Sequence, residues 1–441
     1  MSRKLGCIAN DRQECHDEVG GEVSPAVRSE PVLIYCPGLR KYPENTADGV
    51  AEAVAAALER QRAEAFRAVS LSGQSTPRGL RPGKVVVGPD DSILLHVFEL
   101  DYRARLEPGS GTTGPAPAPG VLRSSVYLAI GTAGLGRAFL RTIRARRTGS
   151  KDGLAMIQLA YGLVILGSLS LSAFVAFVAF VALVAALGAA GAGGVLPARA
   201  DHLFGTSSSH IAVAMGGVAA GGWVVLRRRL LDLAASTQRN MRYLAGDRHR
   251  DTVAMTLGDA VDGLKRNGWT GLVHVLGYSF GSIVAIDALF PPERCASASS
   301  DGDREPLSPA LGRVRAMVRS LTTIGCPADV IRLYRVNYFN NRSAWADGTE
   351  PARWRNVVNA ADVFASDFHD GSDGVGNNGS KGPAIFAPAR LIVYGQEPLS
   401  CRQLLVVKGF RTHSGYWGPP GEASCFDGLA ELWIGVDPAP P

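Results

Sequence analysis

The segment Gly277-Tyr278-Ser279-Phe280-Gly281 combines a serine hydroxyl with two closely spaced glycines. A buried-strand pattern at residues 272–276 precedes it, and a helical pattern at residues 282–289 follows. A serine on such a sharp strand-to-helix turn holds its hydroxyl out from the backbone, and Gly277 and Gly281 keep the neighbouring chain clear of it. We interpret the segment as a nucleophile elbow with Ser279 as the nucleophile.

A serine hydroxyl is a weak nucleophile at neutral pH, so it needs an adjacent base and a third group that orients the base. His369 and His413 are the histidines downstream of the acid candidates. We predict that His413 is the base, because it follows the last expected strand. His369 is the poorer choice, since it stands seven residues after Asp362 in an acidic loop.

The acid of such a triad is expected at Asp362. This residue lies just beyond the carboxyl end of an expected strand at residues 354–359, where the loops of a parallel sheet converge. Asp367 is the first alternative. Asp329, after the preceding strand, is a third option, and its structural interpretation is a helix N-cap.

Strand and helix patterns alternate on both sides of a long apolar segment. The strand patterns are 31–36, 93–100, 272–276, 320–324, 354–359 and 391–394, and the helical patterns are 46–68, 239–266 and 282–289. Strands that alternate with helices predict an α/β fold with a mostly parallel sheet covered on both faces. The polar stretches 296–309 and 371–383 are surface loops, interpreted as insertions or as lids.

The apolar segment at residues 153–196 has no charged residue. A membrane-spanning helix needs about 20 apolar residues, so this segment predicts one span. A second run at residues 211–226 is shorter, and Gly217 and Gly221 within it have the spacing that lets two membrane helices pack closely. A buried soluble helix is the alternative for this second run.

Basic residues flank the two apolar runs. Six precede the first run, three follow the second, and only Arg199 lies in the loop between them. This asymmetry predicts two spans with both ends in the cytoplasm. A break of the first run near residues 168–172 would give three spans and separate the soluble parts, so two are preferred. Charges at the edges of apolar runs also argue against a nucleic-acid surface, although the net charge is +6.

The seven cysteines include no C-x-x-C pair, which argues against a zinc site and a disulfide framework, and no metal or cofactor is expected. Residues 1–30 form a polar tail without the apolar core of a secretory signal.

The elbow, the strand order and the chain order Ser279, Asp362, His413 together resemble the α/β-hydrolase superfamily, particularly its lipase- and esterase-like members. The resemblance covers about residues 31–102 and 239–417, with the membrane hairpin inserted between. Together with the polar start of the chain and the two apolar runs, it divides the chain into four segments, which are a flexible tail at 1–30, the first part of the hydrolase domain at 31–150, a transmembrane hairpin at 151–229 and the second part of the domain at 230–441.

The resemblance also implies an oxyanion hole formed by two backbone amides, one of them the N–H of Phe280. The other belongs to the turn Pro37-Gly38-Leu39-Arg40 after the first strand. Because Pro37 has no N–H, Leu39 or Arg40 is the expected donor. Cys36-Pro37 stands where the family commonly has a His-Gly pair.

These features predict a membrane-anchored serine hydrolase that cleaves an ester, of a lipid or another acyl compound, through an acyl-enzyme. A transacylase would use the same triad. A non-catalytic membrane scaffold that keeps the fold is the alternative from another class, because fold does not fix function. A pore is disfavoured, since neither span has an ionisable residue to line a polar pathway.

Overall fold

The structure, a computed structural model, describes a subset of the 441 residues. These are residues 27–38, 46–70, 76–106, 243–244, 247–292, 314–335, 338–340, 342, 354–359, 362, 365–366, 368, 384–386, 389–394, 415–417 and 423–435. The expected membrane hairpin at 151–229 and the loops at 296–309 and 371–383 lie outside them. Of the helices within the described ranges, none is both long and apolar enough to cross a bilayer.

The core of the fold is an eight-stranded sheet with the order β2-β3-β4-β1-β5-β6-β7-β8. The strands are β1 (Val32–Cys36), β2 (Arg67–Val69), β3 (Leu80–Val87), β4 (Ile93–Leu100), β5 (Val273–Tyr278), β6 (Val318–Ile324), β7 (Trp354–Asn359) and β8 (Ala389–Tyr394). Neighbours from β4 to β8 are parallel, whereas β3 is antiparallel to both β2 and β4. The expectation of a mostly parallel α/β sheet is therefore confirmed.

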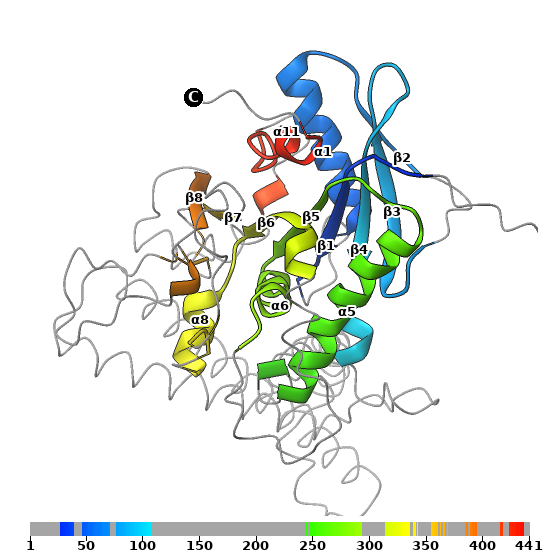
Figure 1. Cartoon of the computed structure of the whole chain (residues 1–441). Coiled ribbons are helices and arrows are strands. Elements are labelled where there is room, and N and C mark those ends of the chain that lie inside the picture. Colours follow the sequence, from blue (N-terminus) through cyan, green and yellow to red (C-terminus); the bar gives the residue numbers. More distant parts are fainter. Residues whose placement is uncertain are drawn as a thin grey trace, which may run out of the picture.

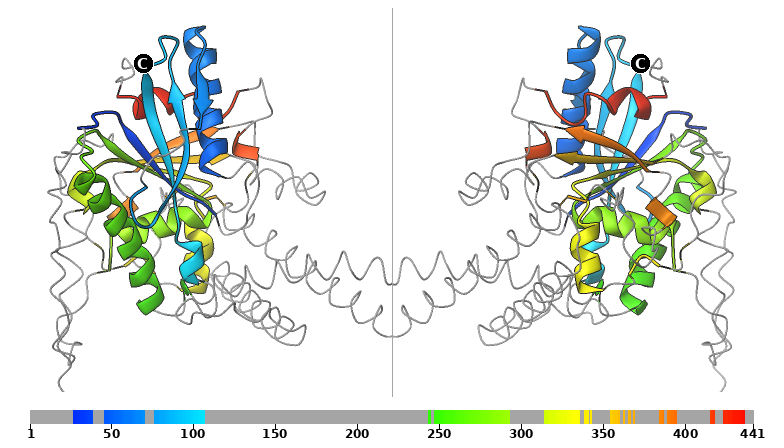
Figure 2. Two further views of the ribbon diagram at one scale, coloured as in Figure 1. Left: turned by 90° about the vertical axis from the view of Figure 1, so that its right-hand side faces the viewer. Right: turned by 90° about the vertical axis from the view of Figure 1, so that its left-hand side faces the viewer.

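Helices cover both faces of the sheet (Figure 1). One face carries α1 (Ala47–Arg62) and α11 (Ala430–Trp433), and the other carries α5 (Asp247–Arg266), α6 (Phe280–Leu289) and α8 (Ala328–Tyr334), as Figure 2 shows from the side. Successive strand residues face opposite sides, so Ile34 and Val275 pack with α5 and α6, while Leu33 and Leu276 pack with α1. Three short 3-10 helices complete the described elements: η1 (Arg103–Leu106), η5 (Ala384–Phe386) and η6 (Gly415–Trp417).

Helix α1 is shorter than the helical pattern at residues 46–68 suggests. It begins at an N-cap, where the Thr46 side chain accepts a hydrogen bond from the Gly49 N–H at 3.2 Å. It ends because Ala63 adopts a left-handed conformation, with φ of 53°, and its N–H bonds to the Glu59 carbonyl. The expected helical residues 67 and 68 instead belong to β2.

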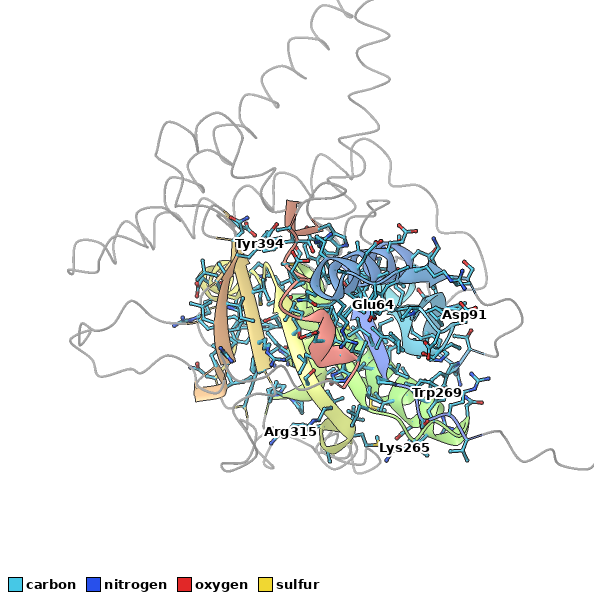
Figure 3. All side chains as sticks on the ribbon, turned by 90° about the horizontal axis from the view of Figure 1, so that it is seen from above. Glu64, Asp91, Lys265, Trp269, Arg315 and Tyr394 are labelled. Atoms are coloured by element: carbon cyan, nitrogen blue, oxygen red, sulfur yellow. The ribbon has the colours of Figure 1, made fainter. Side chains whose placement is uncertain are left out.

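Strand β3 has no counterpart among the expected elements. Pro82 and Gly83 interrupt its sequence and give it the composition of a loop. Gly83 is needed there, because a Cβ at this position would lie 2.6 Å from the Cβ of Ala47 on α1. Seen from above, the hairpin turn at Asp91 and the β8 residue Tyr394 lie at opposite ends of the sheet (Figure 3).

The order of the strands changes direction at β1. Strands β2, β3 and β4 follow β1 in the chain and lie on one side of it, whereas β5 lies on its other side. In an open parallel sheet, such a switch point leaves a crevice outside the carboxyl ends of the two strands, which is where ligands bind. Pro37 and Gly38 follow β1 at this point, and Ser279 follows β5.

Candidate active site

Ser279 lies between the last residue of β5 and the first residue of α6, as the sequence pattern predicts. Its backbone has φ of 53° and ψ of −126°, a conformation that L-residues rarely adopt and that costs about 1–3 kcal/mol. Two hydrogen bonds fix it, from the Ser279 N–H to the Ile324 carbonyl at 2.8 Å and from the Ser282 N–H to the Ser279 carbonyl at 2.9 Å. The side chain is half-buried at the carboxyl edge of the sheet.

The elbow glycines Gly277 and Gly281 allow the backbone to pass at close range. A Cβ on Gly277 would lie 2.5 Å from the Cα of Ser282, and a Cβ on Gly281 would lie 1.9 Å from the carbonyl oxygen of Cys36. Neither position accepts a larger residue without displacing backbone. The close approach of α6 to the end of β1 therefore depends on these two residues.

The turn after β1 lies directly beside the elbow. A Cβ built on Gly38 would be 3.3 Å from the Cβ of Ser279 and 3.4 Å from the ring of Tyr278. Phe280 is the first residue of α6, where backbone N–H groups have no acceptor within the helix and the helix dipole favours negative charge. Leu39, the expected second donor, lies outside the described residues, as does Arg40.

Asp362 follows the carboxyl end of β7 and is buried, with 6% of its surface exposed. Its N–H donates to the Asn359 carbonyl at 2.8 Å. Its carboxylate accepts a hydrogen bond of 2.8 Å from the Tyr416 hydroxyl, which itself accepts the Asn359 N–H at 2.9 Å. Burial, and then the charge of Asp362, raise the pKa of Tyr416, so its hydroxyl keeps its proton and remains a donor.

Tyr416 belongs to η6, three residues after His413 in the sequence. His413 itself lies outside the described residues. The ring of the neighbouring Trp417 packs edge-on against Tyr278, with centroids 4.6 Å apart, and Tyr278 is the residue before Ser279. The structure thus joins η6 to both the acid candidate and the elbow.

Asp329, the alternative acid that the structure describes, has different neighbours from Asp362. Asp329 lies in the first turn of α8, whose N-cap is Pro327, so the N-cap interpretation of Asp329 is wrong. Its N–H donates to the Ser366 hydroxyl at 2.6 Å, and its carboxylate pairs with Arg332 in the same helix at 3.5 Å. Asp367 and His369 lie outside the described residues.

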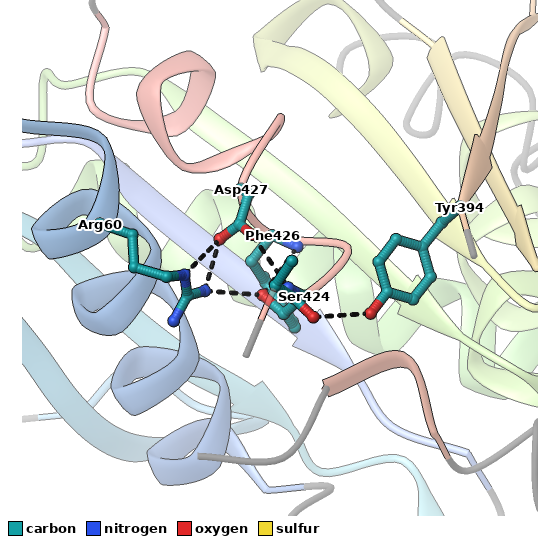
Figure 4. A network of polar contacts seen from close by, with 6 residues as sticks. Arg60, Tyr394, Ser424, Phe426 and Asp427 are labelled. Carbon is teal, nitrogen blue, oxygen red and sulfur yellow. Dashed lines mark hydrogen bonds and ion pairs between the residues drawn. The ribbon is translucent and has the colours of Figure 1, made fainter. Parts of the chain in front are cut away.

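A polar network anchors the chain on either side of the His413 segment (Figure 4). The Tyr394 hydroxyl at the end of β8 donates to the Ala423 carbonyl at 2.8 Å. Arg60 on α1 forms an ion pair with Asp427 and reaches the Ser424 hydroxyl at 3.3 Å. Residues 423–435 are therefore fixed to both α1 and β8.

Sequence reasoning missed Tyr416 and Trp417 as parts of this site. In the sequence, the only feature that could have indicated them is their position shortly after His413. Aromatic residues occur in many loops, so this feature is not specific. Their contacts with Asp362 and Tyr278 arise from the tertiary fold.

Within the described ranges, no group of three or more His, Cys, Asp or Glu side chains is arranged to hold a metal ion. Comparison of the chain with protein-family models, with curated proteins and with solved structures finds no match.

Proposed function

We propose that this protein is a serine hydrolase of the α/β-hydrolase type, in which Ser279, His413 and Asp362 form a catalytic triad. The observation that carries the proposal is the strained backbone of Ser279 between β5 and α6, directly beside Gly38. Strain of this size persists where the surrounding structure enforces it, and it is concentrated at functional sites. Its position at the switch point of a parallel sheet is where a ligand is expected.

The chain order of the acid and the base supports the same assignment. Asp362 follows β7, and His413 comes after β8 and three residues before Tyr416. Three residues of chain extend over at most about 10 Å, and the hydroxyl of Tyr416 bonds to Asp362, so the length of the chain is compatible with His413 as the partner of Asp362. Asp329 is the weaker acid candidate, because Arg332 of its own helix already pairs with it.

The reaction follows from these roles. The Ser279 hydroxyl attacks the ester carbonyl while His413 takes its proton, and Asp362 stabilises the resulting imidazolium. The backbone N–H of Phe280 and an N–H from the turn after β1 stabilise the oxygen that becomes negative. His413 then protonates the leaving alcohol, and water releases the acyl group from Ser279 by the reverse sequence of proton transfers.

The substrate class is proposed from the predicted membrane hairpin. Residues 107–242 separate η1 from the residues that lead into α5, and they include the hairpin at 151–229. A hairpin of two spans with cytoplasmic ends would hold the hydrolase domain at the bilayer surface, where a lipid or another acyl ester would reach Ser279. A transacylase would replace water by another acceptor in the last step.

A fluorophosphonate probe, which reacts with activated serines, tests the assignment on the detergent-solubilised full chain. We expect labelling of the wild type and its loss in Ser279→Ala and His413→Ala. The control is Ser92→Ala, which removes an exposed serine in the β3–β4 turn and should leave labelling unchanged. An unlabelled but folded wild type would exclude the hydrolase and favour the membrane scaffold.

A further inference from the structure

The carbonyl groups of Pro37 and Gly38, in the turn after β1, accept hydrogen bonds from two consecutive residues that follow β4. The Tyr102 hydroxyl donates to the Pro37 carbonyl, and the Arg103 Nε donates to the Gly38 carbonyl at 2.9 Å. Tyr102 is fully buried and Arg103 is 6% exposed, so water does not compete with either bond. The orientation of the turn is thereby fixed from one side.

The Tyr102 bond decides where the N–H of Gly38 points, and the Arg103 bond fixes the following peptide, which limits rotation of the backbone at Gly38 from its other side. The described chain has no cis peptide, and in a planar trans peptide the N–H points opposite to the carbonyl. Since Tyr102 holds the Pro37 carbonyl, the Gly38 N–H points away from Tyr102. This N–H has no hydrogen-bond partner in the described part of the chain, and Gly38 lies against Ser279.

We propose that Tyr102 and Arg103 are positioning residues for the oxyanion hole, which hold the Pro37–Gly38 turn so that the Gly38 N–H is its second donor. A rotated peptide would instead turn a carbonyl oxygen toward the developing oxyanion and repel it. The assignment rests on the proposed serine hydrolase function. It names Gly38, in place of Leu39, as the partner of Phe280.

The charge of Arg103 is itself held in place. Its guanidinium lies 3.7 Å from the Glu99 carboxylate, and both side chains are nearly buried. Glu99 also accepts the N–H of Ala47, the first residue of α1, at 3.4 Å. Arg103 therefore connects the turn to β4 and, through Glu99, to the start of α1.

The buried ion pair determines the choice of variants. Removing Arg103 alone would leave Glu99 as an uncompensated buried charge and could unfold the protein, whereas replacing both partners is far better tolerated. The test variant is therefore Glu99→Gln/Arg103→Met, because glutamine keeps an acceptor for the Ala47 N–H. Arg67→Met/Asp91→Asn is the matched control, since it removes an exposed ion pair near the far edge of the sheet.

The assay uses p-nitrophenyl acetate hydrolysis by the full chain in detergent, with inhibition by a trifluoromethyl ketone that forms an anionic adduct on serine. For Glu99→Gln/Arg103→Met we expect kcat to fall by about 100-fold, as on loss of one oxyanion donor. KM should change less than about threefold, and the inhibitor should weaken by the same factor as kcat/KM falls. Tyr102→Phe should lower kcat by roughly tenfold, and Arg103→Lys should retain part of the activity because lysine keeps a donor.

A structural role alone would lower the folded fraction and leave the kcat of the folded enzyme and the inhibitor affinity intact. Wild-type kcat and inhibition in the folded double variant would overturn the positioning role while the hydrolase function stands. If the double variant does not fold, Tyr102→Phe decides, and unchanged kcat in that variant overturns the proposal. A wild type that neither hydrolyses the ester nor reacts with a fluorophosphonate removes the proposed function and this inference with it.

Discussion

Gly281 has no room for a side chain, because a Cβ there would lie 1.9 Å from the carbonyl oxygen of Cys36. Gly281→Ala must therefore push α6 away from β1 and move Ser279 away from Gly38. We expect the rate of fluorophosphonate labelling to fall at least about tenfold and the free energy of unfolding to fall by about 2–3 kcal/mol. Labelling kinetics and urea unfolding measure the two effects.

The control for this substitution is Gly428→Ala, where an added Cβ meets no atom within 4 Å. It should leave the labelling rate within about twofold and stability within about 0.5 kcal/mol of the wild type. Equal effects of the two substitutions would contradict the tight packing of the elbow.

Tyr416 is expected to hold the acid in place, since its hydroxyl bonds both to Asp362 and to the Asn359 N–H. Tyr416→Phe removes the hydrogen bonds to the Asp362 carboxylate and from the Asn359 N–H. The loss of these bonds should lower the free energy of unfolding by about 1–3 kcal/mol. We also expect kcat for p-nitrophenyl acetate to fall by about tenfold, because the carboxylate loses one of the contacts that orient it. Tyr394→Phe, which loses a hydroxyl bond to the Ala423 carbonyl, should change kcat far less; equal losses would argue against a special role of Tyr416.

His274 gives the fold a dependence on pH. It is 1% exposed, and its Nδ1 lies 2.7 Å from the Ser320 hydroxyl. Burial, with the charges of Arg319 and Arg355, lowers the pKa of His274 to about 3, so the folded protein keeps it neutral. The unfolded chain takes up the proton below about pH 6.5, so its contribution to stability is complete above that pH and is lost as pH falls toward 3.

From pH 7.5 to 5.0 this linkage should lower the free energy of unfolding by about 2 kcal/mol. His274→Asn, which keeps a polar atom near Ser320, should lower stability at pH 7.5 but remove this share of the pH dependence. Urea unfolding of both proteins at the two pH values measures the difference. Parallel loss in wild type and variant would show that His274 does not titrate as inferred.

Among the elements, the sequence predicted those whose pattern is local. The limits of β4 and β7 match the expected strands, because each is a continuous run of strand-forming residues bounded by turns. β3 could not be predicted, since Pro82 and Gly83 hide it and its partner β4 supplies the pairing. Ser279 is evident in the sequence because the elbow is a local pattern. The proposed roles of Arg103 and Tyr416 are not, because they depend on contacts with residues far away in the sequence.

Helix α6 contains a buried charge that connects it to two other segments. The Asp287 carboxylate pairs with Arg342 at 2.6 Å, with both side chains fully buried, and it accepts the hydroxyls of Tyr243 and Tyr338. Tyr243 also packs edge-on against Phe280, with centroids 5.2 Å apart. The network therefore fixes the start of α6, which presents the Phe280 N–H.

Breaking this network should destabilise the protein by about 3–5 kcal/mol in Arg342→Met, because Asp287 would remain charged and buried. The variant Asp287→Leu/Arg342→Met should recover most of that loss, since it buries no unpaired charge. Urea unfolding of the two variants distinguishes them. An Arg342→Met protein as stable as the wild type would contradict the burial of this pair.

At the scale of the whole molecule, the chain leaves the sheet and returns to it at one apolar cluster. Leu106 at the end of η1 and Tyr243 on the return both belong to the cluster beneath α5 and α6, and both are almost completely buried. Residues 107–242 thus connect two described parts of the chain that contribute to the same apolar cluster. Buried apolar residues of the described elements form a cluster on each face of the sheet, so we expect this domain to fold without residues 107–242.

Replacing residues 110–240 by a flexible Gly/Ser linker of about ten residues tests this organisation, because such a linker reaches roughly 17 Å on average. We expect a variant that unfolds cooperatively in urea and keeps fluorophosphonate labelling of Ser279. If residues 151–229 form the membrane hairpin, the full chain should sediment with membranes and the shortened chain should stay in the supernatant. Sedimentation of the shortened chain with membranes in a folded state would place the membrane contact on the sheet domain itself. A variant that cannot fold would show that the insertion contributes to the core, and would contradict the proposed two-part domain.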